Sequence, residues 1–180
     1  MTYSIFLQEW PSKAFAGVFS LGPRPYGIPA PMAEPQEREY LSSSRTKGRE
    51  LALKLLYLAD LSGRATASAQ VPELLESETD SAAVREFAKE LFEGIEASVD
   101  EVDALLESAA LNWQVSRMPY VDRAILRMGA YELMKLHDVP PKVTISEAIE
   151  LARRYSTEKS SSFINGVLDK IYQTHCPEKV

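Results

Sequence analysis

The stretch YVDRAILRMGAYELMKL, residues 120–136, has the pattern that decides the fold. Its apolar side chains recur mostly at steps of three and four residues, which places them along one side of a helix. Charged residues fall between them, so the pattern predicts an opposite face that is charged and open to a partner. The apolar side consists of Val121, Ala124, Ile125, Met128, Tyr131 and Leu136, and the charged side of Asp122, Arg123, Arg127 and Glu132.

Proline marks both ends of this predicted helix. Pro119 lies just before it and suits a helix start, and Pro140 and Pro141 are expected to stop the chain from continuing. The helix is therefore expected to lie between two clear boundaries.

The composition is that of an ordinary soluble protein. The chain has 180 residues with 45% apolar and 26% charged residues, enough for one domain or two small halves that share a core. Its single cysteine, Cys176, excludes a disulfide framework and favours a reducing compartment. No signal peptide and no apolar run of about 18 residues is apparent, so a cytoplasmic location is expected and a membrane span is not.

The first part of the chain differs from the rest in its proline content. Six of the 11 prolines lie in residues 1–35, which leaves no room there for a helix or strand of useful length. Residues 1–44 are therefore predicted to be a disordered extension, with two alternatives left open. The extension could dock through its aromatic residues, or Met32 could be the true start.

Four further helices are expected from apolar periodicity. A core helix begins near residue 45 and ends at Gly63, and a single long helix covers residues 81–109 with Gly94 as its weak point. The spacing of Thr144 and Glu147 predicts a capping box at the start of the next helix. Gly166, inside the last helix, predicts a close helix contact.

Two local concentrations of polar residues could bind an anion. Arg45, Lys47 and Arg49 lie at the predicted start of the first helix, where the helix dipole disfavours cations. A bound phosphate would explain them, and a solvated basic face would explain them equally well. Lys159 with Ser160, Ser161 and Ser162 precedes the last helix, where hydroxyls either cap the helix or bind phosphate.

Catalytic motifs are missing from the sequence. His137 and His175, the only histidines, have no metal-ligand spacing, and neither is paired with a credible nucleophile. There is no glycine-rich phosphate loop. The sequence therefore predicts a protein that is not an enzyme and needs no metal or cofactor, and the net charge of −6 limits any nucleic-acid contact to a local patch.

Three segments in this order resemble the NusB family of transcription antitermination factors. They are RTKGRELALKLLY at 45–57, WQVSRMPYVDRAILRMGAYEL at 113–133, and VPPKVTISEAIELA at 139–152 followed by FINGVLDKI at 163–171. The resemblance covers about residues 45 to 175. It implies an all-α fold with two three-helix bundles, 45–112 and 113–175, and about seven helices in all.

The resemblance also implies a function. Members of this family pair with NusE, a small-subunit ribosomal protein, bind the boxA element of nascent ribosomal RNA leaders and act in the RNA polymerase antitermination complex. Two departures imply weaker RNA binding. Thr46 stands where a relative has a further arginine, and Ser162 replaces a residue that is often basic in the family. The matching positions are Arg45, Lys47, Arg49, Lys159, Ser160, Ser161, Ser162 and Phe163 for RNA, and Tyr57, Asp122 and Arg123 for the partner protein.

Two other functions stay open at this point. The same fold precedes a methyltransferase in certain ribosomal RNA modifying proteins, so the chain could be a helical interaction module of an rRNA-modifying or ribosome-assembly complex. It could also be a structural adaptor that binds the ribosomal protein and no RNA.

Overall fold

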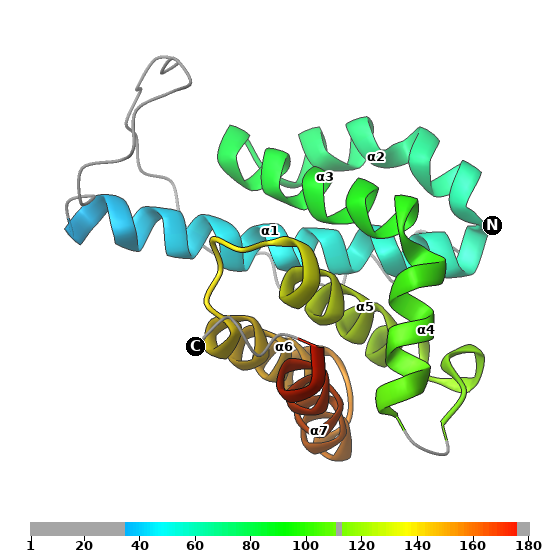
Figure 1. Ribbon diagram of the computed structural model, residues 1–180. Helices are drawn as coiled ribbons and strands as arrows, with labels where there is room; N and C mark the ends of the chain where they lie inside the picture. Colours follow the sequence, from blue (N-terminus) through cyan, green and yellow to red (C-terminus); the bar gives the residue numbers. More distant parts are fainter. Residues whose placement is uncertain (1–34, 111–112, 176–180) are drawn as a thin grey trace. The chain divides into compact units, whose positions relative to one another are not determined.

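The computed structural model describes residues 35–110 and 113–175, and their side chains from residue 43 onward. These ranges form seven α-helices and one short 3-10 helix, with no strand among them (Figure 1). The predicted all-α fold is confirmed, while residues 1–34 of the predicted extension lie outside the described part. The helices are α1 (Pro35–Ser62), α2 (Arg64–Glu78), α3 (Ala82–Ala97), α4 (Val99–Ala109), η1 (Val115–Arg117), α5 (Tyr120–Lys135), α6 (Pro141–Tyr155) and α7 (Glu158–His175).

The first helix begins earlier than the sequence predicts. It starts at Pro35 and not near residue 45, so residues 35–44 are helical. A proline is well tolerated in the first turn of a helix, and the segment that follows has no further proline or glycine before Gly48. The basic residues of α1 therefore lie in the interior of a helix and not at its start.

Helix α5 contacts more of the fold than any other described element. It packs against α1, α3, α4, α6 and α7, while α1 also packs against α2 and α3, and α6 against α7 (Figure 1). Helix α4 contacts both α5 and α7. The division into bundles 45–112 and 113–175 stays a prediction.

The prediction of an exposed charged face on α5 is wrong. Asp122, Arg123, Arg127 and Glu132 are all at most 8% exposed, and residues 122–130 are buried without interruption. Neighbouring helices cover this face as well as the apolar one. Each of the four charges has an oppositely charged or hydroxyl partner, as burial requires.

Two glycines lie where α5 approaches its neighbours α7 and α3 closely. A Cβ at Gly129 of α5 would lie 2.7 Å from Cδ1 of Leu168 on α7, and a Cβ at Gly94 of α3 would overlap the ring of Tyr131 on α5. Both distances are below those that side chains tolerate. A methyl group at either position would therefore force the side chain of Leu168 or Tyr131 to shift from the observed packing.

Two helix boundaries differ from the sequence prediction. The expected single helix over 81–109 is broken at Ser98, whose hydroxyl donates to the carbonyl of Gly94 at 2.7 Å. Serine competes with the helix ladder in this way. Helix α6 begins at Pro141, so Thr144 lies inside the helix and the predicted capping box is wrong.

Candidate nucleic-acid interface

The basic residues of α1 have different surroundings. Lys47 is exposed and forms no ion pair with any residue that the structure describes. Arg45 is partly exposed, pairs with Asp138 and lies 5.4 Å from the ring centre of Phe87. Of these two, Lys47 is the cation that an anion can reach without breaking an existing pair.

Arg49 is buried in the protein. Its side chain is 3% exposed, its Nε donates to Oε1 of Glu132 at 2.8 Å, and its Nη2 donates to Oε2 at 2.7 Å. Glu147 lies 3.5 Å from the Nη1 of Arg49, and the hydroxyl of Thr144 donates to Glu132 at 3.3 Å. This arrangement favours a structural role for Arg49 over the phosphate contact that the sequence predicts.

The segment from Lys159 to Phe163 forms the first turns of α7. Lys159 and Ser162 are exposed, and neither has a hydrogen bond or ion pair with the described residues. The hydroxyl of Ser161 donates to the carbonyl of Glu158 at 3.0 Å. Only part of this predicted patch is therefore open to a ligand.

Ser160 and Asp122 form a buried contact between α7 and α5. The hydroxyl of Ser160 donates to Oδ2 of Asp122 at 2.9 Å, and the hydroxyl of Ser156 donates to Oδ1 of the same carboxylate. Asp122 is 5% exposed and Ser160 is also 5% exposed. Both residues therefore hold the start of α7 in place, which favours that role over the RNA and partner contacts predicted for them.

Trp113 was not predicted to belong to this patch. Its side chain is 52% exposed. Its ring lies 5.3 Å from that of Phe163, tilted by 47°. Nothing in the sequence pattern joins the two residues, because the contact depends on how the connector before α5 meets α7.

Tyr57 and the buried Arg123 both contact Tyr120, which lies at a second surface. The rings of Tyr57 and Tyr120 meet edge to face at 6.2 Å, and the guanidinium of Arg123 lies 5.0 Å from the centre of the Tyr120 ring. Leu61, one turn after Tyr57 on α1, is 40% exposed. Tyr57, Leu61 and Tyr120 are called the tyrosine surface below, and Tyr120 and Leu61 were not among the predicted residues.

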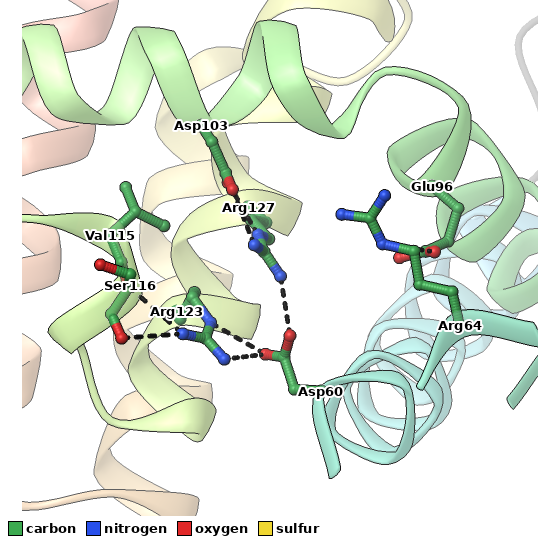
Figure 2. Close-up of polar contacts among 8 residues, drawn as sticks. All are labelled: Asp60, Arg64, Glu96, Asp103, Val115, Ser116, Arg123 and Arg127. Atoms are coloured by element: carbon green, nitrogen blue, oxygen red, sulfur yellow. Dashed lines mark hydrogen bonds and ion pairs between the residues drawn. The ribbon is translucent and has the colours of Figure 1, made fainter. Parts of the chain in front are cut away.

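Arg123, which contacts Tyr120, belongs to a network of two arginines and two carboxylates. Figure 2 shows this network. Arg123 Nε donates to Oδ2 of Asp60 at 2.9 Å, and Arg127 Nη1 donates to Oδ1 of Asp60 at 3.0 Å. Arg127 also forms a two-bond contact with Asp103, at 2.7 Å for each bond. The network connects α1, α4 and α5.

The network also explains the protonation of Arg127. Burial by itself lowers the pKa of this guanidinium, but the hydrogen bonds and charges of Asp103 and Asp60 outweigh burial and raise it. The positive charge of Arg127 is therefore stabilised by these two carboxylates. The charges of this region serve packing between helices and leave no free cation for a ligand.

No group of three or more histidine, cysteine or acidic side chains that could hold a metal occurs in the described residues. Among the helices of residues 35–110 and 113–175, none is long and apolar enough to cross a membrane. The described residues offer two separate exposed cations, Lys47 on α1 and Lys159 on α7, and the tyrosine surface.

Comparisons with known proteins identify the family of this chain. The model of the NusB family matches residues 46–173. The chain is 45% identical over 136 residues to the transcription antitermination protein NusB of Geobacter sulfurreducens, which covers 76% of this chain and 98% of that protein. It is 44% identical over 134 residues to the protein of the same name from Clavibacter michiganensis subsp. michiganensis, covering 73% and 98%.

Two solved structures are similar in fold. The structure of T. maritima NusB has a TM-score of 0.68 and 34% sequence identity, and covers 74% of this chain and 94% of that chain. A crystal structure of antitermination factors NusB and NusE in complex with dsRNA has a TM-score of 0.68 and 29% identity, with 74% and 98% covered.

Proposed function

This chain belongs to the NusB family, and from that premise we propose that it is an RNA-binding transcription antitermination factor. It pairs with the ribosomal protein NusE and binds boxA in nascent ribosomal RNA leaders. One of the similar structures holds NusB and NusE together with RNA, which supports both partners. The protein acts by binding and not by catalysis, in the cytoplasm, as a component of the RNA polymerase antitermination complex.

The observation that carries this proposal is the contrast between paired and unpaired cations. The buried arginines Arg49, Arg123 and Arg127 are all held by carboxylates, whereas Lys47 and Lys159 are exposed without an ion pair in the described part. The chain as a whole has a net charge of −6. Free cations on an acidic protein bind a polyanion locally and release its counterions.

The tyrosine surface supports the pairing with NusE. Interfaces are enriched in aromatic residues, and Tyr120, at 44% exposed, presents an aromatic ring beside Tyr57 and Leu61. The ion pair between Asp60 and Arg123 holds the Arg123 guanidinium against the ring of Tyr120. The protein contact therefore uses side chains different from those that contact RNA.

The proposal is tested by fluorescence anisotropy with labelled boxA RNA, NusE and the full chain. The double variant Lys47→Glu/Lys159→Glu is expected to bind RNA more weakly. The slope of log K against log salt should also become shallower, by about 0.7 for each lost phosphate contact with single-stranded RNA. Lys89→Glu is the matched control, because Lys89 is exposed on α3 and pairs with Glu93.

Three outcomes are distinguished. Weaker RNA binding by the double variant with a normal Lys89→Glu supports the proposal. Equal losses in both variants mean that overall charge decides binding and that Lys47 and Lys159 form no site. Tight binding to NusE without any affinity for RNA overturns the RNA-binding role and leaves a structural adaptor.

A further inference from the structure

Gly166 lies in the interior of α7 without a packing reason. It is exposed, and a Cβ built on it meets nothing within 4 Å. The close helix contact predicted from the sequence is therefore absent. Glycine weakens a helix interior relative to alanine, so an exposed glycine with open space needs another explanation. One explanation is a ligand that approaches the helix backbone.

The neighbours of Gly166 on the helix surface suggest what the ligand is. Lys159, Phe163, Gly166 and Lys170 follow each other at steps of four, three and four residues, so they share one face of α7. Both lysines are exposed, and neither has an ion pair in residues 43–110 and 113–175. Between them the helix rises by roughly 16 Å.

An acidic residue borders this face but does not neutralise it. Asp169 accepts a hydrogen bond from the side-chain amide of Gln173 at 2.6 Å. It forms no ion pair with Lys170 among the described contacts. The face therefore has two lysines without an ion pair and, between them, a position without a side chain at Gly166, where the helix backbone is open to a ligand.

Aromatic rings lie at one end of the same face. Trp113 is 52% exposed and packs against Phe163 at 5.3 Å. Exposed aromatic rings beside free lysines are the combination that binds single-stranded nucleic acid, since bases stack on the rings and phosphates meet the cations. A protein interface is a poorer fit, because lysine is depleted at such interfaces.

We propose that single-stranded RNA runs along this face of α7 from Lys159 to Lys170, with a base on Trp113 and Phe163 and the strand close to the backbone at Gly166. This inference rests on the proposed RNA-binding function. It extends the RNA path beyond the start of α7 and adds Trp113, Gly166 and Lys170 to it.

Gly166→Ala gives the sharpest test, because it separates folding from binding. The added methyl group has room in the free protein and improves helix propensity, so the Tm should rise by about 2 to 4 °C. The same methyl group obstructs a strand that lies on the backbone, so the affinity for labelled boxA RNA in the complex with NusE should fall about fivefold or more. A stabilised variant that binds less RNA cannot be explained by misfolding.

Three further variants, at Trp113 and Lys170, test the rest of the face. Trp113→Ala should weaken RNA binding about 5- to 150-fold, the range for one lost base stack, and Trp113→Phe should restore much of it. Lys170→Glu should reduce the salt slope by about 0.7, whereas Lys89→Glu on α3 should leave it unchanged.

The outcomes separate this inference from the proposed function. If wild-type RNA binding is intact but Gly166→Ala, Trp113→Ala and Lys170→Glu all bind like wild type, this RNA path is wrong while the proposed function stands. If the same variants lose NusE and keep RNA, the face binds protein and the inference is overturned. If the wild-type complex binds no RNA, both fail.

Discussion

Arg49 of α1 and Glu132 of α5 form a buried two-bond ion pair, with Nε–Oε1 at 2.8 Å and Nη2–Oε2 at 2.7 Å. The side chains are 3% and 1% exposed, so neither charge is solvated by water and each is stabilised by the other instead. The guanidinium also lies 5.4 Å from the ring centre of Phe87 on α3. With Glu147 of α6 at 3.5 Å, Arg49 of α1 thus contacts side chains of three other helices.

Removing one member of this pair should destabilise the fold strongly. Arg49→Met leaves Glu132 buried without its main partner and should lower the free energy of unfolding by about 3 to 5 kcal/mol. The double variant Arg49→Met/Glu132→Leu should recover most of that loss, because no buried charge remains. Urea denaturation of the three proteins measures both effects. A loss below about 1 kcal/mol for the single variant, typical of surface pairs, would contradict the structural role.

The start of α7 should depend on Asp122. Asp122→Ala removes the acceptor of the hydroxyls of Ser156 and Ser160, and should cost about 1 to 3 kcal/mol. Asp122→Asn keeps an oxygen acceptor and should cost less. Amide hydrogen exchange locates the effect, since protection should be lost first in the turn that contains Ser160. Unchanged exchange there would mean that Asp122 does not hold α7.

The contact between α5 and α7 should not accept a methyl group at Gly129. The nearest atom, Cδ1 of Leu168, lies 2.7 Å from the added Cβ, and Leu168 is fully buried, so it would have to shift within the core. Gly129→Ala should therefore destabilise the protein by about 1 to 3 kcal/mol. A double-mutant cycle with Leu168→Ala should show a favourable coupling energy between the two changes. Additive losses would mean that the clash is relieved elsewhere.

Glu96 of α3 should make the stability depend on pH. Burial raises the pKa of this carboxyl above its ordinary value of 4.5, although Arg64, at 3.3 Å, opposes the shift (Figure 2). The folded state therefore holds the proton more tightly than the unfolded state. The contribution of Glu96 to the free energy of unfolding falls as pH rises from 4.5 through the raised pKa.

The variant Glu96→Gln isolates this contribution from that of the other carboxylates. Its stability relative to wild type should increase between pH 4 and pH 7, because only wild type gains the poorly solvated charge. Denaturant midpoints at several pH values give the comparison. If the stability difference between Glu96→Gln and wild type stayed constant across this pH range, the charged Glu96 would be as well stabilised in the folded state as in the unfolded chain.

The sequence predicts the helices and the buried apolar residues better than it predicts which charged side chains are buried. Ala124, Ile125 and Met128 are buried as the apolar periodicity of α5 predicts, and Gly63 ends α1 with a φ of 88°. Periodicity reports which positions are apolar, but not how many neighbours surround a helix. Arg123, predicted on an open face, is covered for that reason.

The candidate site was only partly predictable for a related reason. Lys47 and Lys159 lie exposed where the basic segments predict cations, but Arg49 faces Glu132, which is 83 residues away in sequence. Glycines were also misjudged, since Gly94 has the close helix contact and Gly166 has open space. Such features depend on tertiary neighbours, which no local pattern contains.

The tyrosine surface should affect partner binding and not stability. Tyr57→Ala combined with Leu61→Ala should weaken binding of NusE by about 2 kcal/mol or more, the loss typical of an interface hot spot. Leu61 is 40% exposed, so its truncation removes little from the core. Isothermal titration with NusE and urea denaturation measure the two quantities. Val143→Ala is the matched control, because Val143 on α6 is 44% exposed and lies outside the tyrosine surface. If NusE docked on the tyrosine surface, it would bury the Tyr57 ring and the Leu61 side chain, and truncating them would remove these contacts. Equal NusE binding by all variants would therefore place the contact on another face.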